Sequence, residues 1–214
     1  HKTVPIIVGG PFVINKVTGT APEKLSDLFR AGGADYYIKD PSGEDILRDL
    51  LGNIKAGTAP DDVRNLYVRS ENDYQFTFER NQAYDFNANQ IDWDLFAGRL
   101  AHVVNVRTAV SCPYKCAFCN FPLYAGKYDL ASLEQVEAEL RQLHDQGIRH
   151  IQFVDDTFNV PKRRFKDQLR MMIRNDFGFH WNSYYKCQYA VEETVELMKE
   201  SGCEFVFLGI ESGN

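Results

Sequence analysis

Three cysteines in the middle of the chain restrict its fold and chemistry more than any other feature of the sequence. Cys112, Cys116 and Cys119 follow one another at the spacing C-x₃-C-x₂-C, and the aromatic Phe118 stands just before the last of them. Three thiolates on one short segment are soft ligands that suit an iron–sulfur cluster or zinc. A closed zinc site has four ligands and a common 4Fe–4S cluster has four cysteines. Three cysteines therefore leave one metal position open for a small molecule.

The flanking sequence places the cysteines on a long loop between a strand and a helix. Residues 105–110 predict a strand that runs into the loop. Ser132 and Gln135 form a capping-box pair, which predicts that a helix begins there. On these residues alone, the alternative to an iron–sulfur cluster is a zinc site completed by a distant histidine such as His102.

Upstream of the cysteines, predicted strands and helices alternate. An apolar run at 4–8 predicts a buried strand that ends at Gly9-Gly10-Pro11, and residues 34–38 predict a second strand. Helices are expected from Pro22 to the glycines at 32–33 and over 44–55, where apolar residues recur at helical spacing. The β-α-β-α order implies a parallel sheet of the doubly wound type.

Downstream of the cysteines, the same alternation continues. Three more strands are predicted at 148–154, 179–185 and 205–210, and helices begin near 132, 161 and 192. Together with the strand at 105–110 they make four parallel strands and three helices, which is a partial βα barrel. In such folds the active site gathers at the carboxyl ends of the strands.

These patterns divide the α/β chain into three parts. Residues 1–58 are expected to be the C-terminal part of a doubly wound domain, and residues 105–214 the first half of a partial barrel. Between them, 59–104 is expected to be a connector with a small hairpin over 65–69 and 74–79. The chain lacks an initiating methionine and stops just after a strand-like segment, so we expect an excerpt of a longer protein.

Composition narrows the possible partners. The formal net charge is −6, with acidic and basic residues interspersed, which argues against a nucleic-acid surface. No apolar run approaches the roughly 20 residues of a membrane helix, and no signal peptide is apparent, so we expect a cytoplasmic protein without a membrane partner. The two cysteines outside the motif, Cys187 and Cys203, are expected to be small buried residues.

The cysteine loop resembles the hallmark loop of the radical S-adenosylmethionine (SAM) enzymes, which follows the first strand of a βα barrel. Four other segments are similar to the cobalamin-dependent branch of that superfamily, and above all to its phosphinate (P-) methyltransferases: Arg107–Ser111, Asn120–Pro122, Phe153–Phe158 and Leu208–Gly213. In that family a cobalamin-binding domain precedes the barrel. The resemblance therefore implies that residues 1–58 end a Rossmann-like cobalamin-binding domain.

The resemblance implies three cofactors, namely a 4Fe–4S cluster, SAM and cobalamin. Cys112, Cys116 and Cys119 would hold three irons, and the amino and carboxylate groups of SAM would chelate the fourth. The reduced cluster would cleave SAM to a 5′-deoxyadenosyl radical, and methylcobalamin would deliver a methyl group. The implied partners are a small-molecule substrate and an external electron donor of the flavodoxin or ferredoxin type.

The resemblance also assigns positions that bind SAM. Phe118 would lie against the adenine, and Glu211 at the ribose or amino end. Asp155 and Asp156 would lie near the methionine amino group, and only one of them is expected to reach it because neighbouring strand residues face opposite ways. Lys186 stands where the family is expected to carry arginine for a carboxylate, although lysine is a point charge and not a fork. The alternative interpretations are a core aromatic for Phe118 and a surface residue for Glu211. For Asp155 and Asp156 the alternative is a helix N-terminus or a solvated turn.

Gly9 and Gly10 match a glycine pair that lets the backbone approach the nucleotide tail of cobalamin, because glycine has no Cβ. The alternative is a plain turn at the end of a strand. The implied substrate is a phosphinate intermediate of a natural product, or else one methylated at carbon. Two other functions are open: a cobalamin-dependent radical SAM cyclase or rearrangement enzyme, and a non-catalytic iron–sulfur or zinc-binding module. The lack of a nearby fourth cysteine argues against the module.

Overall fold

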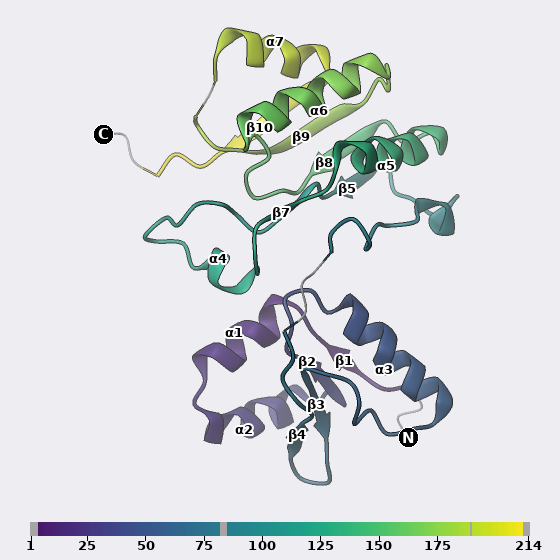
Figure 1. Cartoon of the computed structure of the whole chain (residues 1–214), viewed down its shortest axis with the longest axis vertical. Coiled ribbons are helices and arrows are strands. Elements are labelled where there is room, and N and C mark those ends of the chain that lie inside the picture. Colours follow the sequence, from purple (N-terminus) through teal and green to yellow (C-terminus); the bar gives the residue numbers. More distant parts are fainter. Residues whose placement is uncertain (1–3, 82–84, 189, 212–214) are drawn as a thin grey trace. The chain divides into compact units, whose positions relative to one another are not determined.

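The computed structural model describes residues 4–81, 85–188 and 190–211. The chain divides into two compact units (Figure 1). The first comprises His1–Tyr84 and Ala117–Gly126, and the second comprises Asp85–Cys116 and Lys127–Asn214. No helix in the described ranges is long and apolar enough to cross a membrane. Each unit has its own sheet, and the two are described in turn.

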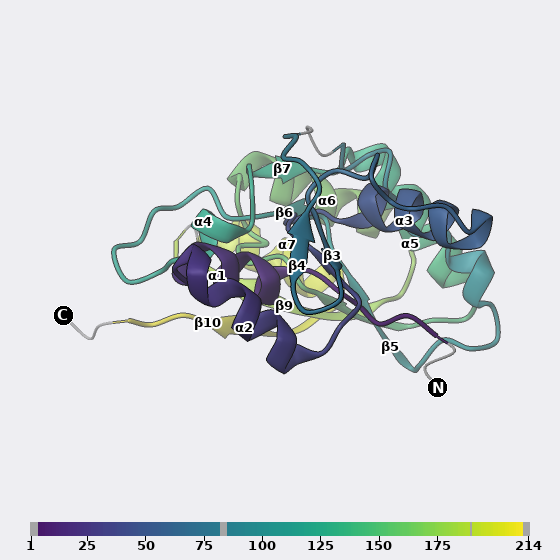
Figure 2. The same ribbon diagram turned by 90° about the horizontal axis from the view of Figure 1, so that it is seen from below.

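The sheet of the first unit has the strand order β1-β2-β3-β4. Strand β1 (Ile7–Val8) pairs parallel with β2 (Tyr36–Ile38). Strands β3 (Leu66–Arg69) and β4 (Tyr74–Phe76) form an antiparallel hairpin (Figure 2). Strand β3 pairs antiparallel with β2. The sheet is therefore mixed, not purely parallel as predicted. The hairpin that the sequence placed in a connector belongs to this sheet because β3 pairs with all three residues of β2.

Helices cover both faces of this sheet. Helix α1 (Pro11–Gly19) and helix α2 (Pro22–Gly32) share one buried cluster with Tyr37. Helix α3 (Glu44–Ala56) shares another with Ile38. Because neighbouring residues of a strand face opposite ways, α1 and α2 lie on one face of the sheet and α3 lies on the other.

The predictions of α2 and α3 are confirmed, whereas α1 was not predicted. The segment Gly9-Gly10-Pro11 has the composition of a turn, which hid the helix that follows it. Pro11 occupies the first turn of α1, where its missing N–H has no cost, and Val13 is fully buried. Gly10 precedes the helix with φ of 75° and ψ of −163°, a conformation available almost only to glycine.

The second unit is built on four parallel strands in the order β10-β9-β8-β5. The strands are β5 (Val103–Val106), β8 (His150–Phe153), β9 (His180–Tyr185) and β10 (Cys203–Leu208). Every neighbouring pair is parallel, and β8 pairs with both β5 and β9. The four predicted parallel strands of the partial barrel are therefore confirmed, although the first is interrupted.

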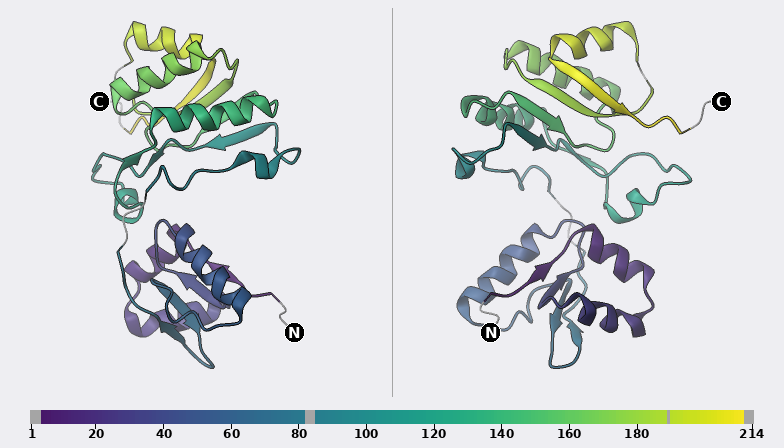
Figure 3. Two further views of the ribbon diagram at one scale, coloured as in Figure 1. Left: turned by 45° about the vertical axis from the view of Figure 1, so that its right-hand side comes forward. Right: turned by 180° about the vertical axis from the view of Figure 1, so that it is seen from behind.

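Three helices connect these strands and pack on one face of the sheet (Figure 3). They are α5 (Leu133–Asp145), α6 (Lys162–Arg174) and α7 (Glu192–Glu200), and all three were predicted. The strands alternate accordingly, because Phe153 and Trp181 are fully buried whereas His150 and His180 are exposed.

Three short elements were not predicted, and one predicted strand is interrupted. The strand expected over 105–110 is broken at Arg107-Thr108, and its second part, β6 (Ala109–Val110), pairs antiparallel with β7 (Asp129–Leu130). A 3-10 helix, η1 (Trp93–Phe96), lies against α5, where the Trp93 Nε1 donates to a glutamate of that helix. Helix α4 (Phe121–Tyr124) belongs to the first unit.

Replacing Trp181 by alanine should sharply destabilise the second unit. Trp181 is fully buried, and its Nε1 donates a 3.0 Å hydrogen bond to the carbonyl of Ser201. We expect Trp181→Ala to lower the free energy of unfolding by about 3–5 kcal/mol, measured by urea denaturation. The control Val195→Ala, at a position that is 52% exposed on α7, should change it by less than about 0.5 kcal/mol. Equal effects would contradict this packing.

Candidate metal centre

The predicted site residues of the second unit meet at one edge of its sheet. All four strands are parallel, so their carboxyl ends lie at the same edge. The cysteine loop follows β5 and β6, and Asp155 and Asp156 follow β8. Lys186 follows β9 and Glu211 lies beyond β10. The parallel pairing of the strands was predicted and is confirmed, whereas the assembly of these residues into one site stays a prediction.

The other predicted residues, including the last cysteine of the loop, belong to the first unit. Gly9 and Gly10 belong to the first unit, at the turn between β1 and α1. Phe118 and Cys119 stand in the segment Ala117–Gly126, which is grouped with the first unit. Phe118 is 68% exposed, so it is not the core aromatic that was the alternative interpretation.

The donor set of the loop fits an iron–sulfur cluster. Cys112 and Cys116 are partly buried, Cys119 is exposed, and all three are free thiols. Residues 111–120 form bends and turns, so no helix or strand ladder holds their backbone. Within the described ranges, no three histidine, cysteine or carboxylate side chains are already placed to hold a metal ion. Cluster binding by these cysteines stays a prediction that requires the loop to close around the metal.

Asp155 fastens the start of the cysteine loop to the sheet. One carboxylate oxygen accepts the backbone N–H of Thr108 at 2.6 Å and of Ala109 at 3.0 Å, and the other accepts the Thr108 hydroxyl at 2.5 Å. Asp155 is only 2% exposed. Burial raises its pKa to about 6, against the opposing effect of these hydrogen bonds and of nearby Arg164. The group is therefore mainly ionised at neutral pH and has both oxygens engaged.

The exit of the loop is fastened close to its entry. Strand β7 pairs with β6 in the register Ala109↔Leu130, and the Ala131 N–H donates to the Thr108 carbonyl at 3.0 Å. Arg164 of α6 donates to the Ala131 carbonyl at 2.7 Å. Burial lowers the pKa of this guanidinium, and Asp155 opposes the shift. Both ends of the loop are thus held beside Asp155.

Cys112 is the cysteine nearest to this anchored neck. Ser111, just before it, is 4% exposed and has a φ of 66°, a left-handed conformation that is uncommon for a residue other than glycine. The Cys112 sulfur lies 3.9 Å from the Thr157 hydroxyl. The backbone at Cys112 is therefore directed by buried structure on its N-terminal side.

Lys186 faces the cysteine loop. Its Nζ lies 4.1 Å from the centroid of the Tyr114 ring, and the Tyr114 hydroxyl donates to the Gln188 side chain at 3.2 Å. Asn159, which is 1% exposed, accepts the Lys186 N–H at 2.9 Å and donates to the carbonyls of Lys186 and Gln188. The contact of Lys186 with SAM stays a prediction, and here its ammonium lies over an aromatic ring.

The two remaining carboxylates are exposed at the edge. Asp156 is exposed, unlike Asp155, and partial exclusion of water from its carboxylate raises its pKa. Glu211 folds back over the glycine two residues before it, because a Cβ added to Gly209 would lie 3.2 Å from the Glu211 Oε1. Their roles toward SAM stay predictions.

The cysteines outside the motif differ from what was expected. Cys187 is exposed at the same edge, where its sulfur lies 3.7 Å from the Gly209 carbonyl, so the prediction that it is buried is wrong. A turn after β9 places it there. Cys203 is partly buried at the start of β10, and burial raises its pKa to about 11.

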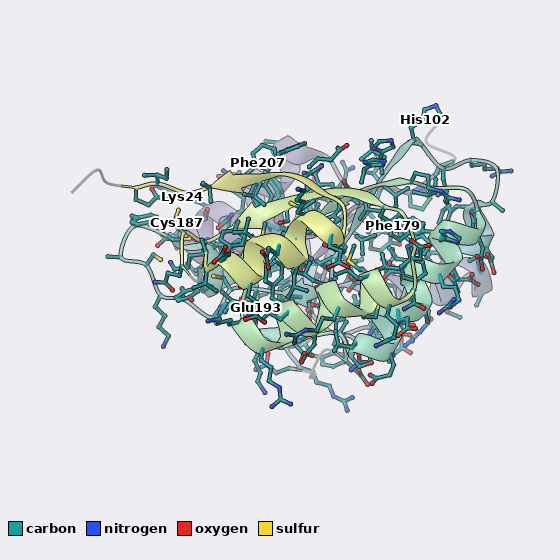
Figure 4. The ribbon with its side chains drawn as sticks, turned by 90° about the horizontal axis from the view of Figure 1, so that it is seen from above. Lys24, His102, Phe179, Cys187, Glu193 and Phe207 are labelled. Atoms are coloured by element: carbon teal, nitrogen blue, oxygen red, sulfur yellow. The ribbon has the colours of Figure 1, made fainter. Side chains whose placement is uncertain are left out.

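The position of His102 argues against the alternative zinc site, in which His102 would be the fourth ligand beside the three cysteines. His102 precedes β5, whereas the cysteine loop leaves the other end of that strand. Four strand residues span about 13 Å, which is far longer than a zinc–ligand bond. His102 and Cys187, which lies at the carboxyl edge, are at opposite ends of the unit in Figure 4.

Comparison with known proteins identifies the family. Residues 106–214, about half of the chain, match the radical SAM superfamily. The chain belongs to the radical SAM superfamily. The matched region begins at the last residue of β5 and includes the cysteine loop and every later strand of the sheet.

Two curated relatives of this radical SAM chain are methyltransferases by name. An uncharacterized methyltransferase of Pyrococcus horikoshii is 36% identical over 111 residues, which are 51% of this chain and 24% of that protein. The bacteriochlorophyllide d C-12(1)-methyltransferase of Chlorobaculum tepidum is 28% identical over 125 residues, which are 55% of this chain and 26% of that protein. The chain thus spans about a quarter of the length of these relatives.

Solved structures share the fold of both units. The radical SAM methyltransferase TsrM from Kitasatospora setae, with tryptophan and a SAM analogue bound, matches 97% of this chain and 41% of its own. The TM-score is 0.68 and the sequence identity is 21%. A second TsrM structure, with cobalamin and a 4Fe–4S cluster bound, has the same TM-score at 20% identity.

Sequence reasoning did not find the residues that support the loop. Thr108, Asn159 and Arg164 all make the contacts described above, but none stands at a spacing that predicts chemistry. Thr108 lies within a segment that carries the family resemblance, and this was the only available signal. Their partners are distant in the sequence, so only the folded chain reveals them.

Replacing Asp155 by asparagine should alter the pH dependence of stability. The folded protein holds the Asp155 proton with a pKa of about 6, above the usual 3.8 of the unfolded chain. The wild type should therefore lose stability from this group as pH rises from about 4 to 6, on the order of 3 kcal/mol. Asp155→Asn should lack this component, measured as the difference between urea unfolding curves at pH 4 and pH 7. Parallel pH profiles would contradict it.

Proposed function

We propose that this chain is the cofactor-binding part of a cobalamin-dependent radical SAM methyltransferase. One observation supports this most directly: in a chain of the radical SAM superfamily, the three-cysteine loop leaves the carboxyl edge of a parallel sheet with its neck fastened by Asp155. The names of the two relatives support methyl transfer, and the TsrM structure with cobalamin bound supports the cofactor.

In this proposal Cys112, Cys116 and Cys119 hold a 4Fe–4S cluster and leave its fourth iron open to SAM. When bound, the cluster and SAM supply a radical after one-electron reduction by an external donor of the flavodoxin or ferredoxin type, and cobalamin carries the methyl group. The protein positions these groups and limits the access of water. The neck of the loop, held by Asp155 and Arg164, is the rigid part from which the cysteines extend.

The edge residues divide the binding of SAM among themselves. Asp156, and not Asp155, is proposed to accept the methionine ammonium, because both oxygens of Asp155 already bind the Thr108–Ala109 backbone. Glu211 is proposed to meet the ribose or amino end. Lys186 is proposed to meet the carboxylate, which requires it to leave the ring of Tyr114.

Cobalamin is proposed to approach the first unit at Gly9 and Gly10. A Cβ at Gly10 would meet nothing within 4 Å, so its backbone borders open space. The substrate is proposed to be a small molecule methylated at phosphorus or at carbon. The resemblance to phosphinate methyltransferases favours phosphorus.

The first test is the EPR spectrum of the protein, purified without oxygen, reconstituted with iron and sulfide and then reduced. A 4Fe–4S signal that changes when SAM is added is expected from an open iron. Cys112→Ala, Cys116→Ala and Cys119→Ala should each abolish it. Cys187→Ala, which removes an exposed thiol at the same edge, is the control and should keep both the iron content and the signal. The proposal would be refuted if the protein held stoichiometric zinc in place of the cluster, or if the EPR signal of the cluster did not change when SAM is added.

A second test addresses cobalamin. Gly10→Ala places a Cβ on the backbone proposed to approach the cofactor, so cobalamin affinity should fall at least several-fold, measured by equilibrium dialysis. Gly33→Ala is the control, because Gly33 also has a positive φ of 67° but ends helix α2. Urea unfolding of both variants gives the fraction of folded protein, and the cobalamin affinities are corrected for it. Equal affinities would argue against Gly10 as a cobalamin contact.

A further inference from the structure

The side chain of Cys112 contacts the side chain of Thr157. The Cys112 sulfur and the Thr157 hydroxyl oxygen are 3.9 Å apart, within the range for a hydrogen bond that involves sulfur. A free thiol could donate or accept in this pair. An iron-bound thiolate has no proton and can only accept, so the hydroxyl would then be the donor.

We infer that Thr157 is a positioning residue that donates a hydrogen bond to the Cys112 thiolate and raises the reduction potential of the cluster. This inference rests on the proposed function, since it presumes that Cys112 is a cluster ligand. Hydrogen bonds to the sulfurs are among the factors that set the potentials of iron–sulfur clusters. A donor near the sulfur stabilises the reduced cluster more than the oxidised one, because reduction adds negative charge.

The sulfur side of the contact starts from a fixed backbone. Ala109 and Val110 pair with β7, and Ala109 also donates to Asp155. Ser111, which links this ladder to Cys112, is buried. Cys112 can therefore stay close to its present place when the later part of the loop closes around a cluster.

The hydroxyl side is also held by its own segment. Thr157 lies in the turn after β8, two residues beyond Asp155, and its carbonyl accepts the Val160 N–H at 3.2 Å. The next residue, Phe158, is 4% exposed and donates its N–H to the Tyr184 carbonyl at 3.1 Å. Asp155 therefore connects the two sides of this contact. It lies just before the turn that contains Thr157, and its carboxylate accepts backbone N–H groups from the segment that leads to Cys112.

The redox step itself is simple. The external reductant gives one electron to the cluster, no bond forms or breaks in Thr157, and its proton stays on the hydroxyl oxygen. Removing the hydroxyl should therefore shift the potential to more negative values and leave the number of cluster ligands unchanged. This distinguishes Thr157 from the three cysteines, whose loss removes a ligand.

The test is a potentiometric titration of the reconstituted protein, followed by EPR of the reduced cluster. Thr157→Val replaces the hydroxyl by a methyl group of similar size. The two proteins are compared at the potential at which half of the wild-type cluster is reduced. At that potential the ratio of reduced to oxidised cluster should be several-fold lower in Thr157→Val than in wild type. A tenfold lower ratio corresponds to a potential that is 59 mV more negative. Thr157→Ser should restore the wild-type potential. Thr194→Val, a change at a 1% exposed threonine on α7, is the control for altered packing and should leave the potential unchanged.

The possible failures are distinct. A wild-type protein that binds no cluster refutes the proposed function and with it this inference. A cluster that forms in wild type and in Thr157→Val with the same potential overturns this inference alone. If Thr157→Val does not hold a cluster, Thr157→Ala removes the same hydroxyl without a new methyl contact. An unchanged potential in that variant overturns the inference equally.

Discussion

The second unit depends on one buried carboxylate at the end of a strand. Asp155 accepts two backbone N–H groups and one hydroxyl from Thr108–Ala109, at the break between β5 and β6 where no strand ladder supplies acceptors. An unpaired backbone N–H in this buried place would be costly, and so would a buried carboxylate without donors. Each therefore satisfies the other, and the chain turns at a defined point into the cysteine loop.

This interaction separates the loop into an anchored neck and a part that can move. The pairing of β6 with β7 and the Arg164 contact to the Ala131 carbonyl close the neck. Beyond Ser111, bends and turns leave the cysteines on backbone that no ladder restrains. Such a loop can close around a cluster while its base keeps the cluster at the carboxyl edge. Asn159 and Lys186 add a further contact to the loop, through the ring of Tyr114.

Local patterns predicted the elements that local physics determines. The apolar repeats of α5 and α6 bury one face of each helix against the sheet, so their spacing was readable from the sequence alone. The cap of α5 was also predicted, and Ser132 does accept the Gln135 N–H at 3.3 Å. The reciprocal half of that capping box is absent, because the Ser132 N–H donates to the Asn87 Oδ1 at 2.9 Å instead of to the Gln135 side chain. Helix α1 was missed because its start has the composition of a turn.

The sequence by itself determined the cysteine spacing, the superfamily and the order of strands and helices, since each depends on residues that are close along the chain. Only the tertiary structure decided which of Asp155 and Asp156 is buried and which is exposed. It turned Asp155 inward to the backbone of Thr108, 47 residues away, and left Asp156 exposed. It also joined the β3–β4 hairpin to the first sheet and brought Thr157 to Cys112. Hydrogen bonds between distant segments form only when the whole fold brings them together, and no local pattern records them.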